Sequence, residues 1–251
     1  LWFAPLIYLG ALIALVITLA AWEWWRLLFP DNHRRAFSYA GLCLLNLLAW
    51  LMYADIEAVK VLLCLTLAFW LLVVPSIMKQ SLQLNLISWR WPLAAIGLFI
   101  LPACWFALMH LRAVSMALFL SVLVLVWAAD IGAYFVGKKW GKTKLAALIS
   151  PGKSWEGVFG GLGCVLMVFC IVKGFGLLDH FETHFQLKLF FSVIFLMGMS
   201  VVGDLFESLL KRLAGQKDSS QLLPGHGGVL DRLDALLPTL PIAAVLLQLL
   251  R

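Results

Sequence analysis

The sequence predicts an all-α fold, a polytopic bundle of transmembrane helices. Two features of composition support this prediction: 63% of the 251 residues are hydrophobic and only 13% are charged, and the mean hydropathy is +0.99. A soluble domain is closer to half apolar and a quarter charged. The third feature is that the apolar runs are continuous rather than alternating, which favours helices over a membrane barrel.

A helix that crosses a bilayer needs about 20 mostly apolar residues. By this rule the chain contains about eight spans, and we expect a ninth in the full protein because the printed chain begins with Leu1 rather than Met. No repeat, linker or low-complexity tract divides the chain, so we expect a single integral membrane domain over residues 1–251. The approximate limits of the spans are Pro5–Leu28, Ser38–Tyr53, Ala58–Met78, Trp91–Met109, Ala113–Val136, Trp155–Phe175, Lys188–Leu210 and Leu230–Leu250.

The basic residues are distributed unevenly between the loops. Fourteen of the 19 Lys and Arg residues fall in one alternating set of loops, and this set is predicted to face the cytoplasm because positively charged loops are retained there. Since the net charge of +6 is held mainly in these loops, we expect lipid headgroups or an anionic substrate as partners, and no nucleic acid. The fourteen are Arg26, Arg34, Arg35, Lys79, Arg90, Lys138, Lys139, Lys142, Lys144, Lys153, Lys211, Arg212, Lys217 and Arg232.

Seven acidic residues lie within or beside the predicted spans, toward the predicted cytoplasmic side. A carboxylate at the centre of a span costs about 2.5–3.5 kcal/mol, so each one calls for a partner or a function. The alternative is that they are carboxylates at helix ends, in water and paired with nearby Lys or Arg. For Glu23 and Glu156 this alternative explains the residue as well as a functional role does. The seven are Glu23, Asp130, Glu156, Asp204, Glu207, Asp231 and Asp234.

Helical spacing brings several of these acids together with other polar groups. Asp231 and Asp234 stand three residues apart, so they share a helix face from which Arg232 turns away. Carboxylates from two helices that face one cavity form an oxygen-rich site, which suits Mg²⁺ bound together with phosphate oxygens. On the preceding helix, positions i, i+3, i+4 and i+7 of one face are Asp204, Glu207, Ser208 and Lys211.

The loop from 216 to 228 has the features of a phosphate-binding segment. Its three glycines at the end of the loop let a ligand approach the backbone closely, and Lys217 and His226 can meet phosphate oxygens. The loop also leads into Asp231 at a helix N-terminus, where peptide dipoles favour anions. The alternative is a flexible turn with a helix cap.

A second polar segment, Ser150–Ser154, precedes another predicted helix. Its hydroxyls, the amine of Lys153 and free N–H groups can cradle a phosphate, although the segment lacks the spacing of a P-loop. The lysines before it are those of an ordinary cytoplasmic anchor. Gly157 and Gly161 are four apart, a spacing more typical of helix packing than of binding.

These segments resemble the phosphatidate cytidylyltransferase (CDP-diacylglycerol synthase) family. The resemblance covers most of the chain and is strongest in the C-terminal half, about 113–251, which we expect to be the catalytic half. Ser154 stands where the family often has Thr, which keeps the hydroxyl. The segments that carry the resemblance are Ser208–Arg212, Lys217-Asp218, Pro224–Gly228 and Asp231–Asp234, preceded by Ala20–Trp24, Asp130–Tyr134, Gly141-Lys142 and Ser150–Gly157.

The resemblance implies Mg²⁺-dependent transfer of CMP from CTP to phosphatidic acid, with pyrophosphate leaving, in phospholipid biosynthesis. It also implies a homodimer in a bacterial cytoplasmic (inner) membrane, with an active site open to the cytoplasm and to lipid. The chemistry of the residues agrees, because the nucleophile is already anionic and repulsion between phosphates is the main barrier. Metal ions and basic side chains offset that repulsion.

On this basis the candidate residues take three roles. Catalysis is assigned to Asp204, Asp231 and Lys211. Binding of a Mg²⁺ ion is assigned to Asp204 and Asp231, with Asp234, Glu207 and Asp130 as further candidate ligands. Whether a second cation also binds is left open. Asp130 serves either the metal or the cytidine. Binding of CTP or of the lipid phosphate is assigned to Ser150, Lys153, Ser154, Ser208, Arg212, Lys217, Asp218, His226, Gly227, Gly228 and Arg232.

Two other classes of function fit parts of the pattern. A CTP-dependent lipid kinase, or a cytidylyltransferase for another lipid phosphate, would share much of the polar apparatus. A secondary transporter would line its path with acids, but transporters place their sites near the bilayer midplane. Here the polar residues gather toward one surface, which favours an enzyme.

Overall fold

The computed structural model describes residues 5–30, 34–176, 182–225 and 227–250. In this part of the chain, seven helical segments are long and apolar enough to cross a membrane. The predicted fold class, an all-α integral membrane bundle, is confirmed. The seven segments are α1 (Leu6–Leu28), α2 (Arg34–Tyr53), the compound segment Ile56–Gln83, α5 (Leu86–Val114), α6 (Met116–Trp140), α7 (Trp155–Gly174) and α8 (Thr183–Leu213).

The compound segment was expected to be one uninterrupted helix. Instead α3 (Ile56–Ala68) passes through a π-helical turn, η1 (Phe69–Val73), into α4 (Val74–Gln80) and a 3₁₀ turn, η2 (Ser81–Gln83). In the π turn the N–H of Val74 donates to the carbonyl of Phe69, five residues back. The next residue, Pro75, has no N–H and could not make an α-helical hydrogen bond in any case, so the wider turn costs no additional backbone hydrogen bond.

The eighth expected span, Leu230–Leu250, is divided into two helices. The short α9 (Leu230–Leu233) is followed by α10 (Leu236–Leu250), which has 15 residues. Pro238 lies in the first turn of α10, where a missing N–H costs nothing, whereas a continuous helix would need that N–H to bond four residues back. The expectation of one long eighth helix is therefore corrected, and the break leaves Asp234 between the two helices.

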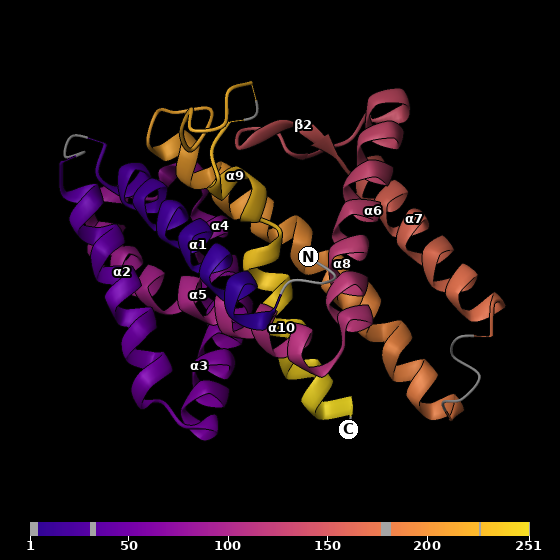
Figure 1. The fold of residues 1–251 in the computed structure, drawn as a ribbon. Helices are drawn as coiled ribbons and strands as arrows, with labels where there is room; N and C mark the ends of the chain where they lie inside the picture. The colour runs from indigo at the N-terminus through magenta and orange to yellow at the C-terminus, as the bar shows by residue number, and fades with distance from the viewer. Residues whose placement is uncertain (1–4, 31–33, 177–181, 226, 251) are drawn as a thin grey trace.

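The helices form two groups joined by α10 and α8. Helices α1, α2 and α5 pack together on one side, α6 and α7 pair on the other, and α10 contacts α3, α5 and α8 between them (Figure 1). The α6–α7 contact is close because glycines lie within it: a Cβ on Gly161 would lie 2.7 Å from the carbonyl oxygen of Ala129, and one on Gly157 would lie 3.0 Å from that of Ala133. The predicted packing role of these two glycines is confirmed.

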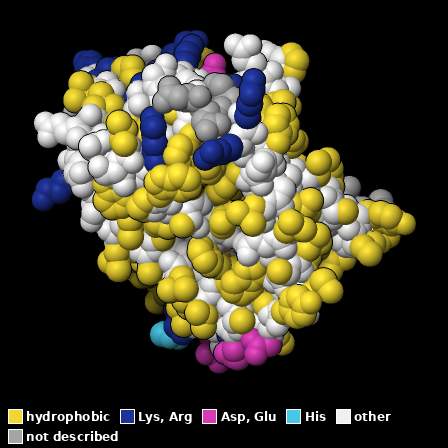
Figure 2. Space-filling view, turned by 90° about the vertical axis from the view of Figure 1, so that its left-hand side faces the viewer, with side chains coloured by type: hydrophobic (Ala, Val, Ile, Leu, Met, Phe, Trp, Pro, Cys, Tyr) yellow, Lys and Arg dark blue, Asp and Glu magenta, His cyan; other side chains and the backbone are white. Residues whose placement is uncertain are grey.

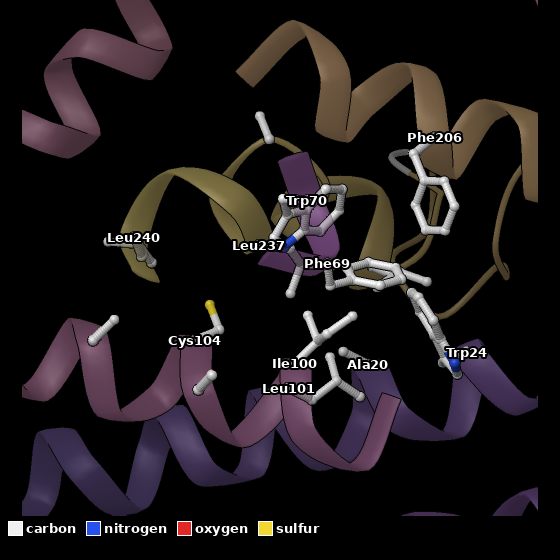
Figure 3. Close-up of a cluster of buried hydrophobic side chains, with 14 of the residues drawn as sticks. Ala20, Trp24, Phe69, Trp70, Ile100, Leu101, Cys104, Phe206, Leu237 and Leu240 are labelled. Atoms are coloured by element: carbon white, nitrogen blue, oxygen red, sulfur yellow. The ribbon is translucent and has the colours of Figure 1, made fainter. Parts of the chain in front are cut away.

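An aromatic cluster links α8 to the N-terminal helices (Figure 3). The ring of Phe206 lies 6.3 Å from that of Trp24, 5.9 Å from Phe69 and 5.5 Å from Trp70, measured between centroids. All four side chains are buried. Because Phe206 stands between Asp204 and Glu207 in the sequence of α8, this cluster fixes the part of α8 that carries those acids.

The two ends of the bundle differ in charge. On the face shown in Figure 2, hydrophobic side chains cover a broad band, with most of the visible Lys and Arg above it and most of the visible Asp and Glu below it. The upper end carries the 214–229 loop, α9 and a short hairpin (Figure 1). The charge asymmetry that the sequence predicts for the loops is thus present in the structure.

Candidate active site

Asp231 lies in α9 at the centre of a dense set of hydrogen bonds. Its Oδ1 accepts from Lys211 Nζ at 2.6 Å, and its Oδ2 accepts from the N–H groups of Ser219 (3.0 Å) and Gly228 (2.7 Å). The hydroxyl of Ser219 is also 2.9 Å from Oδ2. Burial raises the pKa of Asp231, but these bonds outweigh it and hold the pKa below its usual range. Asp231 is therefore an ionised carboxylate whose Oδ2 is held by the loop, whereas its Oδ1 accepts from Lys211 alone.

Glycine at position 227 makes this arrangement possible. Its backbone has φ +80°, a left-handed conformation that L side chains rarely adopt, and a Cβ there would lie 2.8 Å from Asp231 Oδ2. The sequence predicts that the loop glycines allow close approach to a ligand. In the structure the group that approaches Gly227 is the side chain of Asp231.

Asp204 forms a second acid–lysine pair, between α8 and a hairpin. Its Oδ2 lies 2.5 Å from Lys153 Nζ, and its Oδ1 accepts a bond of 3.3 Å from the hydroxyl of Ser208. Lys211, two turns further along the same face of α8, bonds to Glu207 at 2.8 Å and to Asp231 at 2.6 Å. The predicted shared face of α8 is confirmed by these contacts.

A hairpin contains the two β-strands of the described part of the chain and was not among the elements predicted from the sequence. Strands β1 (Lys144–Ala146) and β2 (Ser150–Ser154) pair antiparallel. Glu156 accepts from the N–H of Thr143 at 3.0 Å, and the Nε of Arg212 donates to the carbonyl of Ile149 at 3.2 Å. These bonds hold the hairpin against α7 and α8, and so place Lys153 beside Asp204.

The residues predicted to bind substrate differ in their surroundings, and some of their side chains are already hydrogen-bonded within the protein. Ser154 is buried, and its Oγ accepts from the N–H of Gly157 at 3.2 Å, capping α7. Lys217 and Asp218 line a pocket of about 510 Å³ beside Trp22 and Arg26 at the end of α1. Ser150 is half-buried in β2, Arg232 is exposed on α9, and His226 lies outside the described residues. Substrate contacts of these residues stay predictions.

Two further acids belong to the same electrostatic network. Burial and the nearby charge of Asp204 raise the pKa of Asp234 to about 7, and the N–H of Ala235 donates to Asp234 Oδ1 at 2.7 Å. Asp130 on α6 is close enough to interact electrostatically with Asp204 and Lys153. Ion pairs and electrostatic interactions thus link the five predicted metal candidates across α6, α8, α9 and the break after α9.

The donor set fits a hard cation, although it is not arranged as a finished site. Within the described ranges, no three His, Cys, Asp or Glu side chains lie together as a metal-holding group. Among the described residues, Lys153 pairs with Asp204, and Lys211 pairs with both Glu207 and Asp231, so two lysines serve three of the five carboxylates. In addition, Glu207 Oε1 is buried without a hydrogen-bond partner among these residues. An excess of negative charge and an orphaned carboxylate oxygen are features that a divalent cation would compensate.

The main residue that the sequence left undecided is Glu23. It is completely buried on α1, and its carboxylate accepts hydrogen bonds from the 219–230 segment. The available signal was an acid in a Trp-rich apolar helix. That signal indicates that burying the carboxylate costs free energy, but it does not identify the residues that compensate for it.

The chain resembles known proteins over nearly its whole length. The model of the cytidylyltransferase family matches residues 1–250. A phosphatidate cytidylyltransferase of Pseudomonas aeruginosa is 40% identical over 242 residues, which cover 96% of this chain and 88% of that protein. A phosphatidate cytidylyltransferase of Haemophilus influenzae is 52% identical over 128 residues, which cover 49% of this chain and 43% of that protein. One of Staphylococcus epidermidis is 39% identical over 137 residues, which cover 54% of this chain and 51% of that protein. On these grounds, and with its acids and lysines gathered at one end of a membrane bundle, the chain belongs to the cytidylyltransferase family.

Proposed function

We propose that the protein transfers CMP from CTP to phosphatidic acid, giving CDP-diacylglycerol and pyrophosphate. The family match and the names of the relatives support this activity. The structural observation that carries it is the pair of acid–lysine contacts, Asp204 with Lys153 and Asp231 with Lys211, at the basic end of a membrane bundle. Such an end can meet a lipid phosphate and a soluble triphosphate together.

In this reaction an oxygen of the lipid phosphate attacks the α-phosphorus of CTP. The bond between the α-phosphorus and the bridging oxygen breaks, and pyrophosphate leaves with the electron pair. The nucleophile is already anionic, so no general base is required. Lys153 and Lys211 supply positive charge where two groups of phosphates must approach, and their bonds to Asp204, Glu207 and Asp231 hold the amines in place beforehand.

Mg²⁺ is the cofactor that we propose. Asp204 and Asp231 would hold it, with Asp234, Glu207 and Asp130 as further ligands, and it would neutralise phosphate charge. Both primary ligands now have lysine partners, and Asp231 Oδ2 already accepts two backbone N–H bonds. Oδ1 of Asp231 and Oδ1 of Asp204 have fewer protein partners, so these oxygens would face the ion while Lys153 and Lys211 stay beside the acids.

We further propose the orientation and the assembly of the protein. The basic end of the bundle faces the cytoplasm of a bacterial inner membrane, where CTP is present, in agreement with the distribution of Lys and Arg. A homodimer is proposed from the family resemblance alone. Protease or thiol-reagent access from each side of sealed vesicles tests the first proposal, and mass measurement in detergent tests the second.

The decisive experiment uses the purified protein with CTP, Mg²⁺ and either phosphatidic acid or diacylglycerol. We expect a CMP-lipid and pyrophosphate in equal amounts with phosphatidic acid, and neither with diacylglycerol. A CTP-dependent kinase would instead phosphorylate diacylglycerol and release CDP. Absence of CTP turnover with both lipids would contradict the proposed function.

A further inference from the structure

The carboxylate of Glu23 binds a single segment nearly 200 residues away in the sequence. Its Oε1 accepts from the hydroxyl of Ser220 (2.5 Å) and the N–H of Val229 (3.0 Å). Its Oε2 accepts from the hydroxyl of Ser219 (3.0 Å) and the N–H of Leu230 (2.5 Å). A carboxylate offers about four lone-pair sites. Two backbone N–H groups and the Ser220 hydroxyl fill three of them, the single proton of the Ser219 hydroxyl is shared with Asp231, and Glu23 is 0% exposed.

The same segment supplies the donors that hold Asp231. Three consecutive N–H groups are divided between the two acids: that of Gly228 points to Asp231, and those of the next two residues point to Glu23. The Ser219 hydroxyl lies between both carboxylates, 3.0 Å from Glu23 and 2.9 Å from Asp231. The direction of the backbone at Glu23 therefore determines the direction of the N–H groups at Asp231.

The contact leaves no room for a side chain at position 228. A Cβ on Gly228 would lie 2.1 Å from Ser219 Oγ and 2.6 Å from Glu23 Oε1. The attachment of α1 to the bundle, in contrast, does not depend on Glu23. The neighbouring Trp24 packs on Phe206 and donates to the carbonyl of Leu93 at 3.1 Å. Removing the carboxylate should therefore affect the loop more than the fold.

We propose that Glu23 is a positioning residue for the reaction: through the 219–230 segment it sets the orientation of Asp231 and of the Lys211 amine that Asp231 holds. Glu23 itself touches no substrate. This inference rests on the proposed function, because it assigns Asp231 and Lys211 to the reaction. It adds that the N-terminal half of the chain supplies part of the active site's framework.

The test is Glu23→Gln, which keeps the size of the side chain but replaces one acceptor by a donor. A serine hydroxyl can turn to accommodate the amide, but a backbone N–H cannot. We expect kcat to fall by about 100-fold, as a shift of about 1 Å in a reacting group causes, while the KM values for CTP and phosphatidic acid change less than about threefold. The thermal unfolding midpoint should stay close to that of the wild type.

A second measurement follows the loop without reference to activity. Trypsin cleavage after the exposed Lys217 in the folded protein, measured by mass spectrometry, should be faster in Glu23→Gln than in the wild type. Glu57→Gln is the matched control, because Glu57 is exposed and pairs only with Lys60, at 2.6 Å on the opposite rim. It should match the wild type in kcat, KM and cleavage.

The inference is overturned if Glu23→Gln keeps kcat within about threefold of the wild type, or if kcat falls only in parallel with the unfolding midpoint. If Glu23→Gln does not fold, Ser220→Ala decides, because the Ser220 hydroxyl donates to Glu23, accepts from the N–H of Leu222, and has no bond to Asp231 among the described contacts. An approximately tenfold lower kcat with unchanged KM supports the inference, and an unchanged kcat overturns it. A wild-type protein that forms no CMP-lipid counts against the proposed function, and the trypsin result then decides alone.

Discussion

Asp231→Asn separates the role of the carboxylate charge from the role of its shape. The asparagine oxygen can keep the bonds from Ser219 and Gly228, which are 3.0 and 2.7 Å in the native protein. The amide nitrogen then faces Lys211 Nζ, where a 2.6 Å charged contact stood. Losing one charged hydrogen bond costs about 1.5–3 kcal/mol of unfolding free energy. Lys211 keeps Glu207 at 2.8 Å, so the protein should still fold and insert.

The effect on catalysis should be larger than the effect on stability. If Asp231 holds both Lys211 and the metal, kcat should fall by at least about 10³-fold, equivalent to about 4 kcal/mol in the barrier. The assay is CMP-lipid formation from labelled CTP, with thermal unfolding in the same detergent. Asp55→Asn is the control, because Asp55 caps α3 at the opposite end and Asn is an equally good cap. A variant with kcat within about tenfold of the wild type would remove Asp231 from the site.

Three further predictions address the rest of the site. Lys153→Met removes the partner of Asp204 and should lower kcat/KM for CTP by about 100-fold in steady-state kinetics. The control Lys173→Met, at the far end of α7, should have no effect, and equal kinetics for the two variants would contradict the role of Lys153. Gly228→Ala should destabilise the protein by about 1–3 kcal/mol in thermal unfolding and abolish turnover because its Cβ meets Ser219, whereas Gly198→Ala, with open space around its Cβ, should do neither. Mg²⁺ should raise the unfolding midpoint of the wild type but not of Asp231→Asn, and an equal rise in both would place the ion elsewhere.

Local patterns predicted most of the architecture. Continuous apolar runs located the long helices, and the i, i+4, i+7 spacing placed Ser208 and Lys211 on the face of α8 that carries Asp204. These features depend on residues close together in the sequence. The charge asymmetry of the loops is also visible at the two ends of the bundle.

The features that sequence reasoning missed depend on residues far apart, or on a small energetic difference. The partner of Glu23 lies beyond six other membrane-spanning segments of the described chain, and nothing near Glu23 in the sequence indicates it. The hairpin needed the side chain of Glu156 to bond Thr143, thirteen residues back. The break between α9 and α10 lies just before Pro238, which can stand in the first turn of a new helix, whereas α10 continues through Pro241. Hydropathy alone cannot distinguish those two outcomes.

The π turn at Phe69–Val73 has a consequence for the spacing of residues along the third span. A π turn contains one residue more than an α-helical turn, so every side chain after it is rotated by about 100° relative to an uninterrupted helix. Deleting one residue from this turn would restore a regular α-helix. The side chains either before or after the turn would then be rotated about the helix axis. Either Trp70 would leave Phe206, or α4 would present a different surface to α8. The extra residue thus keeps two contacts in phase that an ideal helix of this sequence could not make together.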